Sequence, residues 1–296
     1  MDSKEYLDAF RRYLSLERNL SKNTSYSYCE DMKLFFDYCE KRRLDILKVD
    51  SDSFGEYLWA GKKKGLRASS LFRKTEAAKA FYKFLALENI LKKNPLQGFK
   101  APRPEKKLPK TLSQNETEKL LSLETDEKYS SLRTAAALEL LYASGIRISE
   151  LINIKTEDLN LPQGWIRVFG KGSKERLVPV NEKACAVLKR YIEERNLRFS
   201  SKSAESYVFL NKSGKKISRI QLWKDIKAFA SAAGIDKNVH PHLLRHSFAT
   251  HLLQRGADLM SISEMLGHSS LSTTQIYTHL DNSQLKEIHK KYHPKG

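Results

Sequence analysis

One proline-rich stretch limits how this chain can fold. Four of the eight prolines fall within NPLQGFKAPRPEKKLPK, which is also basic and poor in apolar residues. Proline fixes φ and lacks a backbone N–H, so such a segment is hostile to helix. We therefore expect an extended linker at residues 95–111, with separate domains at residues 1–94 and 112–296. A chain of 296 residues is long enough to give each domain its own core.

Apolar side chains recur at helical spacing throughout the segment before the linker. Met32, Phe35, Phe36 and Cys39 share one helix face, and Ser21 stands where an N-cap is expected. Helices separated by short loops favour a small bundle of four. The expected helices lie at about residues 3–18, 21–43, 52–63 and 69–88.

The segment after the linker mixes two periodicities. WIRVFGKGSKERLVPV, at residues 165–180, has two β-rich runs around a glycine-containing turn, which predicts a hairpin. Residues 207–217 predict another short strand pair. Ser113 and Glu116 form a capping box, and Gly145 ends the next helix. The fold class we expect is mainly α with small β-hairpin elements. The helices of this segment are expected at about 113–123, 130–143, 182–195, 219–233, 242–255, 259–266, 273–280 and 283–291.

Positive charge is spread over both halves of the chain. Residues 1–110 hold 25 basic and 15 acidic residues, a net charge of +10, and residues 111–296 hold 28 and 20, a net charge of +8. A chain that is basic in both domains favours a nucleic acid backbone as its partner. The alternative, an anionic membrane surface, would need a long basic amphipathic helix with an aromatic face, which we do not find.

The cysteines and the apolar runs bear on the cellular compartment. Cys29, Cys39 and Cys185 form neither a CxxC motif nor an even disulfide set. The opening MDSKEYLDAFRRYL has no apolar signal region, and no run is long enough for membrane insertion. We expect a cytoplasmic protein with reduced thiols.

Charged and reactive side chains gather in the otherwise apolar stretch PHLLRHSFATHLL, residues 241–253. His242 and Arg245 are one turn apart, just after Pro241, at a helix start where free N–H groups favour an anion. A phosphate would fit there. Taken alone, however, the pattern is more typical of a capped core helix with surface cations. Zinc at His242 and His246 is a further alternative, although no third ligand is evident.

Four other positions combine a chemical interpretation with an ordinary structural one. Arg147 in ASGIRISEL could grip two phosphate oxygens or form a local salt bridge with Glu150. Lys171, at a hairpin tip, could donate a proton to a leaving oxygen or be an exposed turn lysine. His268 lies just after a helix end. Tyr277 could be a core residue, or a nucleophile whose hydroxyl, with a pKa of about 10, needs a base and electrostatic help.

These motifs, taken in their order along the chain, resemble one family. LYASGIRISEL, GKGSKERLVPV, HPHLLRHSFATHLLQRGADL, LGHSSLSTTQIYTH and the closing LKEIHKKYHP are similar to motifs of the tyrosine recombinase (phage integrase) family. The resemblance covers nearly the whole chain and is to the Xer branch, nearer its XerD group than its XerC group. It implies a SAM-like, core-DNA-binding domain of four helices followed by an α+β catalytic domain, which together form a C-shaped DNA clamp.

The resemblance implies a phosphate-binding role for four of these positions. Arg147 and Arg245 would clamp the scissile phosphate, His268 would hydrogen-bond it, and Glu150 would support the site. Guanidiniums, imidazoles and a helix N-terminus would stabilise the charge that develops on a pentavalent phosphate. No carboxylate cluster suited to Mg²⁺ accompanies these motifs, so we expect neither a metal nor another cofactor.

The same resemblance implies covalent catalysis. Tyr277 would attack the phosphate and form a 3′-phosphotyrosyl link. His242 would act as general acid/base toward the tyrosine, and Lys171 would be the general acid for the departing 5′ hydroxyl. Because the link conserves the energy of the phosphodiester, cutting and rejoining would need no ATP.

Contacts with DNA and with partner proteins are also expected. The implied partners are double-stranded DNA with a dif-like site, a XerC-like recombinase or further copies of the chain in a tetrameric synaptic complex, and a DNA translocase of the FtsK type. Candidates for groove or phosphate contacts, each equally open to interpretation as part of a solvated helix face, are Arg67, Lys74, Lys79, Gln221 and Lys224.

The last helix has an apolar stripe formed by Leu285, Ile288 and Tyr292. By resemblance, this helix would dock into a neighbouring protomer and tune the nucleophile there. The sequence alone equally permits it to pack on its own domain.

Together these expectations describe a site-specific recombinase that resolves chromosome dimers at a dif-like site during chromosome partition and cell division. The same chemistry would serve an integrase or resolvase of a mobile element. A type IB topoisomerase, which needs no defined target, and a non-catalytic DNA-binding protein are alternatives. The complete set of motif residues argues against the non-catalytic protein.

Overall fold

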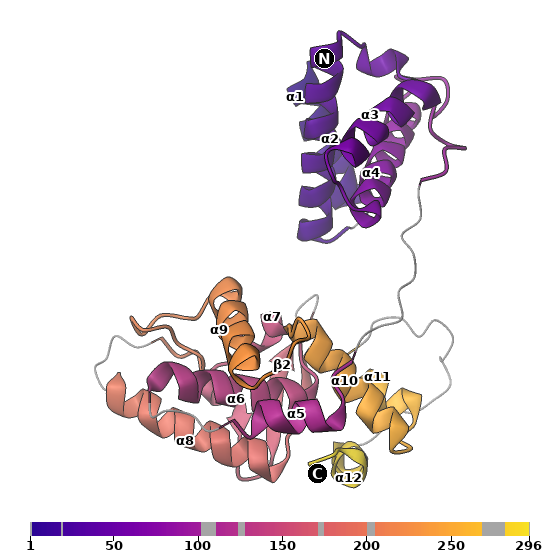
Figure 1. Cartoon of the computed structure of the whole chain (residues 1–296). Coiled ribbons are helices and arrows are strands. Elements are labelled where there is room, and N and C mark those ends of the chain that lie inside the picture. The colour runs from indigo at the N-terminus through magenta and orange to yellow at the C-terminus, as the bar shows by residue number, and fades with distance from the viewer. Residues whose placement is uncertain are drawn as a thin grey trace. The chain divides into compact units, whose positions relative to one another are not determined.

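The computed structural model describes residues 2–18, 20–101, 111–123, 128–170, 175–199, 205–267 and 282–295, with the backbone alone at 282 and 283. The chain divides into two compact units, Met1–Lys107 and Leu108–Gly296 (Figure 1). Each unit has its own hydrophobic core. No helix among the described residues is both long enough and apolar enough to cross a membrane.

The N-terminal unit is the four-helix bundle that the apolar spacing predicts. Its first three helices begin at side-chain caps: Asp2 and Glu5 form a capping box, the Ser21 hydroxyl accepts a hydrogen bond from the Thr24 N–H, and the Asp50 carboxylate accepts one from the Ser53 N–H. The elements are α1 (Ser3–Arg12), a π-helical turn (Tyr13–Glu17), α2 (Lys22–Arg42), a 3-10 turn (Ile46–Lys48), α3 (Ser51–Lys63) and α4 (Ala68–Leu87).

Buried aromatic rings from all four helices fill the core of this unit. Phe81 of α4 meets Phe10 of α1 and Phe36 of α2 edge to face, with ring centroids 5.3 and 5.2 Å apart. Phe54 of α3 and Phe35 of α2 meet in the same way at 5.3 Å. Because each ring contacts rings of other helices, the four helices share a single packed core.

The expected linker begins later than residue 95. Leu96 is fully buried in the N-terminal core, and the Phe99 ring lies edge to face against Phe54, with centroids 5.3 Å apart. The Phe99 N–H donates to the Leu96 carbonyl within a turn. The prediction of an extended chain is therefore wrong here, because Pro95 also fits a turn, and the turn buries Leu96 and packs the partly buried Phe99 against the core. Residues 102–110 lie outside the described residues.

The C-terminal unit is mainly helical and contains one short sheet. Its first half contains α5 (Gln114–Leu121), α6 (Tyr129–Ser144), α7 (Ile148–Leu151), a 3-10 turn (Thr156–Asp158), β1 (Leu159–Asn160), β2 (Trp165–Phe169) and β3 (Glu175–Pro179). Its second half contains α8 (Glu182–Arg198), α9 (Arg219–Ala232), α10 (Pro241–Gln254), α11 (Leu259–Leu266) and α12 (Asn282–Tyr292). The helix expected at 273–280 lies outside the described residues.

The three strands form an antiparallel sheet in the order β1-β2-β3. Val168 of β2 pairs with Arg176 of β3, which confirms the predicted hairpin. The strand pair expected at 207–217 is present only in part. Leu210 and Lys216 form an isolated antiparallel bridge within the segment, whereas Tyr207 bridges to Lys155 outside it. The reason is that the Val208 N–H donates to the Ile154 carbonyl, so part of the run pairs outside itself.

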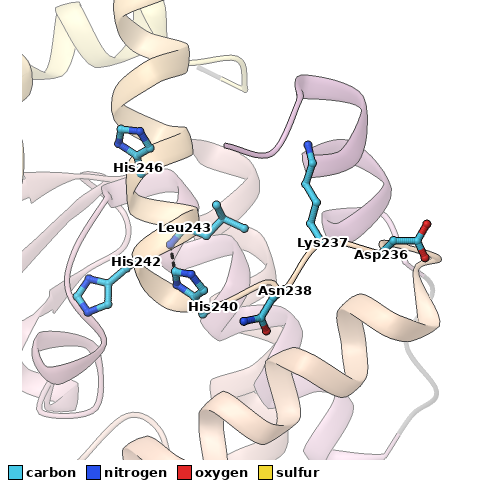
Figure 2. Close-up of a pocket in the computed structure, with 7 residues that line it drawn as sticks. All are labelled: Asp236, Lys237, Asn238, His240, His242, Leu243 and His246. Atoms are coloured by element: carbon cyan, nitrogen blue, oxygen red, sulfur yellow. Dashed lines mark hydrogen bonds between the residues drawn. The ribbon is translucent and has the colours of Figure 1, made fainter. Parts of the chain in front are cut away.

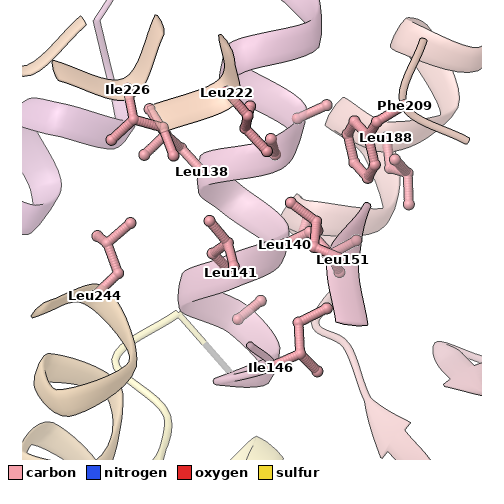
Figure 3. Packing of buried hydrophobic residues seen from close by; sticks show 14 of the residues in the cluster. Leu138, Leu140, Leu141, Ile146, Leu151, Leu188, Phe209, Leu222, Ile226 and Leu244 are labelled. Atoms are coloured by element: carbon pink, nitrogen blue, oxygen red, sulfur yellow. The ribbon is translucent and has the colours of Figure 1, made fainter. Parts of the chain in front are cut away.

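Helix α6 is the central element of the C-terminal unit and is buried along most of its length. Figure 3 shows its leucines meeting side chains from three other helices. On these four helices the figure labels Leu138, Leu140 and Leu141 of α6, Leu188 of α8, Leu222 and Ile226 of α9, and Leu244 of α10. Because α6 is held on several sides, the loop that follows its C-terminus begins from a fixed position.

Helix α12 packs on its own unit. Leu285 is buried, and Ile288 and Tyr292 pack against the same cluster of α10 and α11 residues. The buried His289 donates a hydrogen bond from Nε2 to the Ala143 carbonyl at 2.7 Å. The apolar stripe is thus covered within the chain, as one of the two interpretations of the sequence predicts, and docking of α12 into a neighbouring protomer stays a prediction.

Candidate active site

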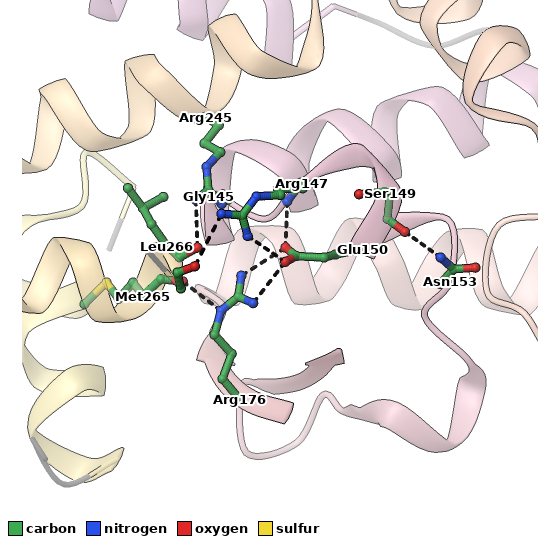
Figure 4. A network of polar contacts seen from close by, with 10 residues as sticks. Gly145, Arg147, Ser149, Glu150, Asn153, Arg176, Arg245, Met265 and Leu266 are labelled. Carbon is green, nitrogen blue, oxygen red and sulfur yellow. Dashed lines mark hydrogen bonds and ion pairs between the residues drawn. The ribbon is translucent and has the colours of Figure 1, made fainter. Parts of the chain in front are cut away.

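Arg245 joins the ends of two helices. It lies on α10, where its Nη1 donates to the Gly145 carbonyl at 2.6 Å and its Nη2 donates to the Leu266 carbonyl at 2.7 Å (Figure 4). These carbonyls stand at the C-terminal ends of α6 and α11. Burial and the neighbouring charge of Arg147 lower the pKa of Arg245 to about 10, so the guanidinium remains charged at neutral pH.

Gly145 makes this junction sterically possible. Its φ of +60° is left-handed, and a Cβ placed there would lie 2.5 Å from the Phe248 ring. Only glycine meets both requirements. The sharp exit from α6 then places Arg147 at the N-cap of α7, two residues further on.

Arg147 and Glu150 are bound to each other, as one of the two sequence interpretations predicts. The carboxylate of Glu150 accepts from the Arg147 backbone N–H at 2.8 Å and from its Nη1 at 2.9 Å. Arg147 Nη2 also donates to the Gly267 carbonyl at 3.3 Å. Even so, 35% of the Arg147 side chain is exposed, so the salt bridge does not remove the guanidinium from solvent.

Arg176 completes the cluster, and sequence reasoning did not single it out. It reaches both oxygens of Glu150, with Nη1–Oε1 at 3.1 Å and Nη2–Oε2 at 2.9 Å. The available signal was its position in β3, two residues before the buried Val178 and therefore on the same face of the strand. An arginine on the inward face of a strand needs a buried acceptor, but the sequence does not say which one.

His242 lies at the start of α10, just after Pro241, which occupies the first turn as predicted. It is exposed, and its ring centroid is 6.4 Å from that of the N-cap residue His240. Figure 2 shows both rings lining a surface pocket with Lys237 and His246. Burial, and then the neighbouring His242, lower the pKa of His240, which favours its neutral form. Among the described residues, no three histidine, cysteine, aspartate or glutamate side chains gather as a metal-binding group.

His251 packs in the interior of the C-terminal unit. Its Nε2 donates to the Leu112 carbonyl at 2.9 Å, and its Nδ1 accepts from the Tyr142 hydroxyl at 2.8 Å. Burial lowers its pKa, in keeping with a neutral ring that fastens the chain before α5 to α6 and α10.

Three of the predicted catalytic residues, Lys171, His268 and Tyr277, lie outside the described residues. The described chain nevertheless runs up to two of them. Strand β2 ends at Phe169, two residues before Lys171, and α11 ends at Leu266 with Gly267 as its C-cap, immediately before His268. The Gly267 carbonyl is the group that accepts from Arg147.

The predicted DNA contacts divide into accessible and inaccessible side chains. Lys74 is wrong as a candidate, because its side chain is only 8% exposed and its Nζ pairs with the buried Asp31 at 3.1 Å. Arg67 is exposed at the start of α4, and Lys79 is partly exposed beside Glu76. On α9, the remaining two candidates, Gln221 and Lys224, are exposed.

Comparison with known proteins places the chain among recombinases. Residues 110–284 match the Phage integrase family, and residues 7–89 match the phage integrase N-terminal SAM-like domain. The chain is 40% identical to the tyrosine recombinase XerD of Chlorobaculum tepidum, over 99% of this chain and 97% of the relative. It is 39% identical to the XerD of Oceanobacillus iheyensis, over 98% of both chains.

Among solved structures, the fold is similar to that of the XerH site-specific recombinase bound to a palindromic difH substrate in a post-cleavage complex. The TM-score is 0.72 at 26% identity, over 97% of this chain and 83% of that chain. The two matched domains fall one in each unit of the fold, and the relatives match over almost the whole chain, including the arginine cluster. The chain therefore belongs to the phage integrase family and is a tyrosine recombinase of the Xer branch, an enzyme of the kind that cleaves and rejoins DNA.

Proposed function

We propose that this XerD-type recombinase acts on a dif-like site and resolves chromosome dimers during chromosome partition and cell division. The N-terminal unit would be the core-DNA-binding domain, and the C-terminal unit would carry the catalytic residues. The observation that supports this most strongly is the cluster of Arg147, Arg176 and Arg245 around the single carboxylate of Glu150. Three guanidiniums against one carboxylate leave two net positive charges, which is a suitable setting for a phosphodiester.

The proposed roles of Arg245 and Arg147 follow from their surroundings. Arg245 is fixed by two main-chain carbonyls, so it would hold one phosphate oxygen without reorganising. Arg147 is partly exposed and would hold the other. Fixed donors aimed at the oxygens that gain charge stabilise a pentavalent transition state more than the ground state.

The chemical step would be a transfer between two oxygens. The Tyr277 oxygen would form a bond to phosphorus while the bond to the 5′ oxygen of the next nucleotide breaks. His242 would take the tyrosine proton, and Lys171 would give a proton to the departing 5′ oxygen. Attack by a 5′ hydroxyl of another strand would reverse the bond changes and exchange the strands. His268 would hydrogen-bond the phosphate throughout.

Partners and location complete the proposal. The protein would work in the cytoplasm on double-stranded DNA, in a tetramer that holds two sites, with a XerC-like recombinase or with further copies of itself. A DNA translocase of the FtsK type would bring the two sites together. Support for a DNA partner comes from the XerH recombinase, whose structures contain a difH substrate, and from the positive charge of both halves of this chain.

Covalent capture tests the proposal. Wild-type protein and Tyr277→Phe are incubated with fragmented genomic DNA of the source organism, denatured with detergent, and the protein-bound ends are sequenced. We expect one chromosomal site, captured by the wild type alone. If the wild type captures nothing, the same incubation is repeated with a XerC-like partner from the same organism.

The alternatives predict different capture patterns. Adducts at many unrelated sites would replace the proposal with a type IB topoisomerase. A single site at the end of a mobile element would indicate an integrase or resolvase. No adduct with or without the partner, despite salt-sensitive DNA binding, would contradict the catalytic assignment.

A further inference from the structure

Glu150 is a buried carboxylate that binds two arginines at the same time. Its side chain is only 4% exposed, and its two oxygens accept four hydrogen bonds, two from Arg176 and two from Arg147. Burial alone would raise the pKa of Glu150. The hydrogen bond from Arg176, followed by the one from the Arg147 N–H, outweighs burial, and the pKa of Glu150 lies below its ordinary value.

The two arginines are placed for different tasks. The Arg176 side chain is 17% exposed and grips the carboxylate with both Nη atoms, whereas Arg147 is 35% exposed and contacts it with one. A bidentate pair is the stronger and more directional of the two. Arg176 is therefore the fixed counter-ion, and Arg147 retains the freedom to meet another anion.

Arg176 also connects three elements around the site. It extends from β3, its Nη atoms reach Glu150 at the end of α7, and its Nε donates to the Met265 carbonyl of α11 at 3.2 Å (Figure 4). Gly267 lies against the same guanidinium, where a Cβ would be 2.9 Å from the Arg176 Cζ. The β2–β3 hairpin is thus tied to the segment that precedes His268.

We propose that Arg176 is a positioning residue for strand cleavage. By holding Glu150 ionised and in place, it fixes the Arg147 backbone and lets the Arg147 side chain turn to a phosphate without leaving a buried carboxylate unpaired. This inference rests on the proposed function, because it gives Arg147 a phosphate to bind.

The test compares Arg176→Gln and Arg176→Lys with Arg167→Gln. Arg167 lies on the neighbouring strand β2 and pairs with another buried carboxylate, Asp158, at 3.0 Å, so its loss disturbs the same hairpin away from the cluster. The probe is the genomic duplex captured by the wild type, nicked beside the cleaved phosphodiester so that the cut fragment diffuses away. The single-turnover rate of adduct formation at saturating protein is measured from pH 5 to pH 9, together with the DNA affinity.

For Arg176→Gln we expect cleavage to slow by about tenfold or more at unchanged DNA affinity, as a misplaced catalytic group does. As the pH is lowered, the activity of this variant should also begin to fall at a higher pH than that of the wild type. The reason is that loss of the Arg176 charge raises the pKa of Glu150, so that Glu150 is protonated at a higher pH. Arg176→Lys should recover part of the rate, and Arg167→Gln should stay within about twofold of the wild type. Equal slowing in the Arg176→Gln and Arg167→Gln variants, or no slowing in Arg176→Gln, would overturn the inference.

A second readout needs no DNA. The Arg147 N–H bonds to Glu150, so its amide exchange, followed by NMR, should quicken in Arg176→Gln and remain unchanged in Arg167→Gln. Unchanged exchange in Arg176→Gln would contradict the positioning role even if the wild type cuts DNA. Absence of any wild-type adduct would contradict the proposed function, whatever the exchange result.

Discussion

Substituting Gly145 by alanine should cost the C-terminal unit much more stability than the same change at Gly234. Both glycines end a helix with left-handed φ, +60° and +68°. A left-handed alanine costs about 1–2 kcal/mol. At Gly145 the new Cβ would also lie 2.5 Å from Phe248 and 2.9 Å from Leu266, whereas nothing lies within 4 Å at Gly234. Overpacking of this kind adds about 1–3 kcal/mol, so we expect a loss of roughly 2–5 kcal/mol for Gly145→Ala and about 1–2 kcal/mol for Gly234→Ala.

Urea unfolding in a Trp59→Phe background measures the difference. Trp165 and Trp223 then report the C-terminal unit alone, because Trp59 is the one tryptophan of the N-terminal unit. The slopes of the unfolding free energy against urea concentration should stay alike. The midpoints of the two variants should then differ by the overpacking energy divided by that slope. Equal losses for the two glycine variants would refute the reasoning, since they would mean that the backbone conformation alone, and not the contact with Phe248, requires glycine at position 145.

Four other predictions follow, three from buried side chains and one from the exposed Arg67. Acidification from pH 7 to about 5 should loosen α12. Burial holds the pKa of His289 and His293 below the unfolded value of about 6.5, so the unfolded segment binds more protons in this pH range. Amide exchange in α12 that is equal at both pH values, after correction for intrinsic rates, would contradict this. Lys74→Met should cost about 1–3 kcal/mol in urea unfolding by removing one of the two cations that pair with the buried Asp31, the other being Arg73, without changing the salt dependence of DNA binding. Arg67→Met should do the reverse, reducing the salt slope by about 1 at unchanged stability. The Cys39 thiol, whose pKa burial raises to about 11, should resist iodoacetamide at pH 8 in the native protein and react after unfolding, as read by mass spectrometry.

Local signals in the sequence account for most of the fold. The caps at Ser21 and Ser113, the glycine end of α6 and the hairpin at 165–180 all lie where they were predicted. Each of these features depends on residues within a few positions of one another, so the sequence pattern contains the cause. The sequence places Leu96 in the linker, because no residue close to it along the chain indicates that its side chain is buried in the N-terminal core.

Pairings between distant residues account for what the sequence did not reveal. Lys74 forms an ion pair with Asp31, which lies 43 positions earlier in the chain. Arg176 binds Glu150 from a different element, 26 positions away. In both cases, the charge is visible in the sequence but its partner depends on how the elements pack. Motif resemblance supplied Arg147 and Arg245, and the geometry supplied the residue that connects their surroundings.

The position of the covalent link tests the central claim most directly. The captured DNA adduct is digested with nuclease and trypsin, and the peptide that retains a nucleotide is identified by mass spectrometry. Cleavage after Arg255 and Lys286 yields a peptide from Gly256 to Lys286 whose only tyrosine is Tyr277. We predict the added phosphonucleotide on that tyrosine, and its loss in Tyr277→Phe. A nucleotide on any other peptide, or an adduct that persists in Tyr277→Phe, would contradict the account.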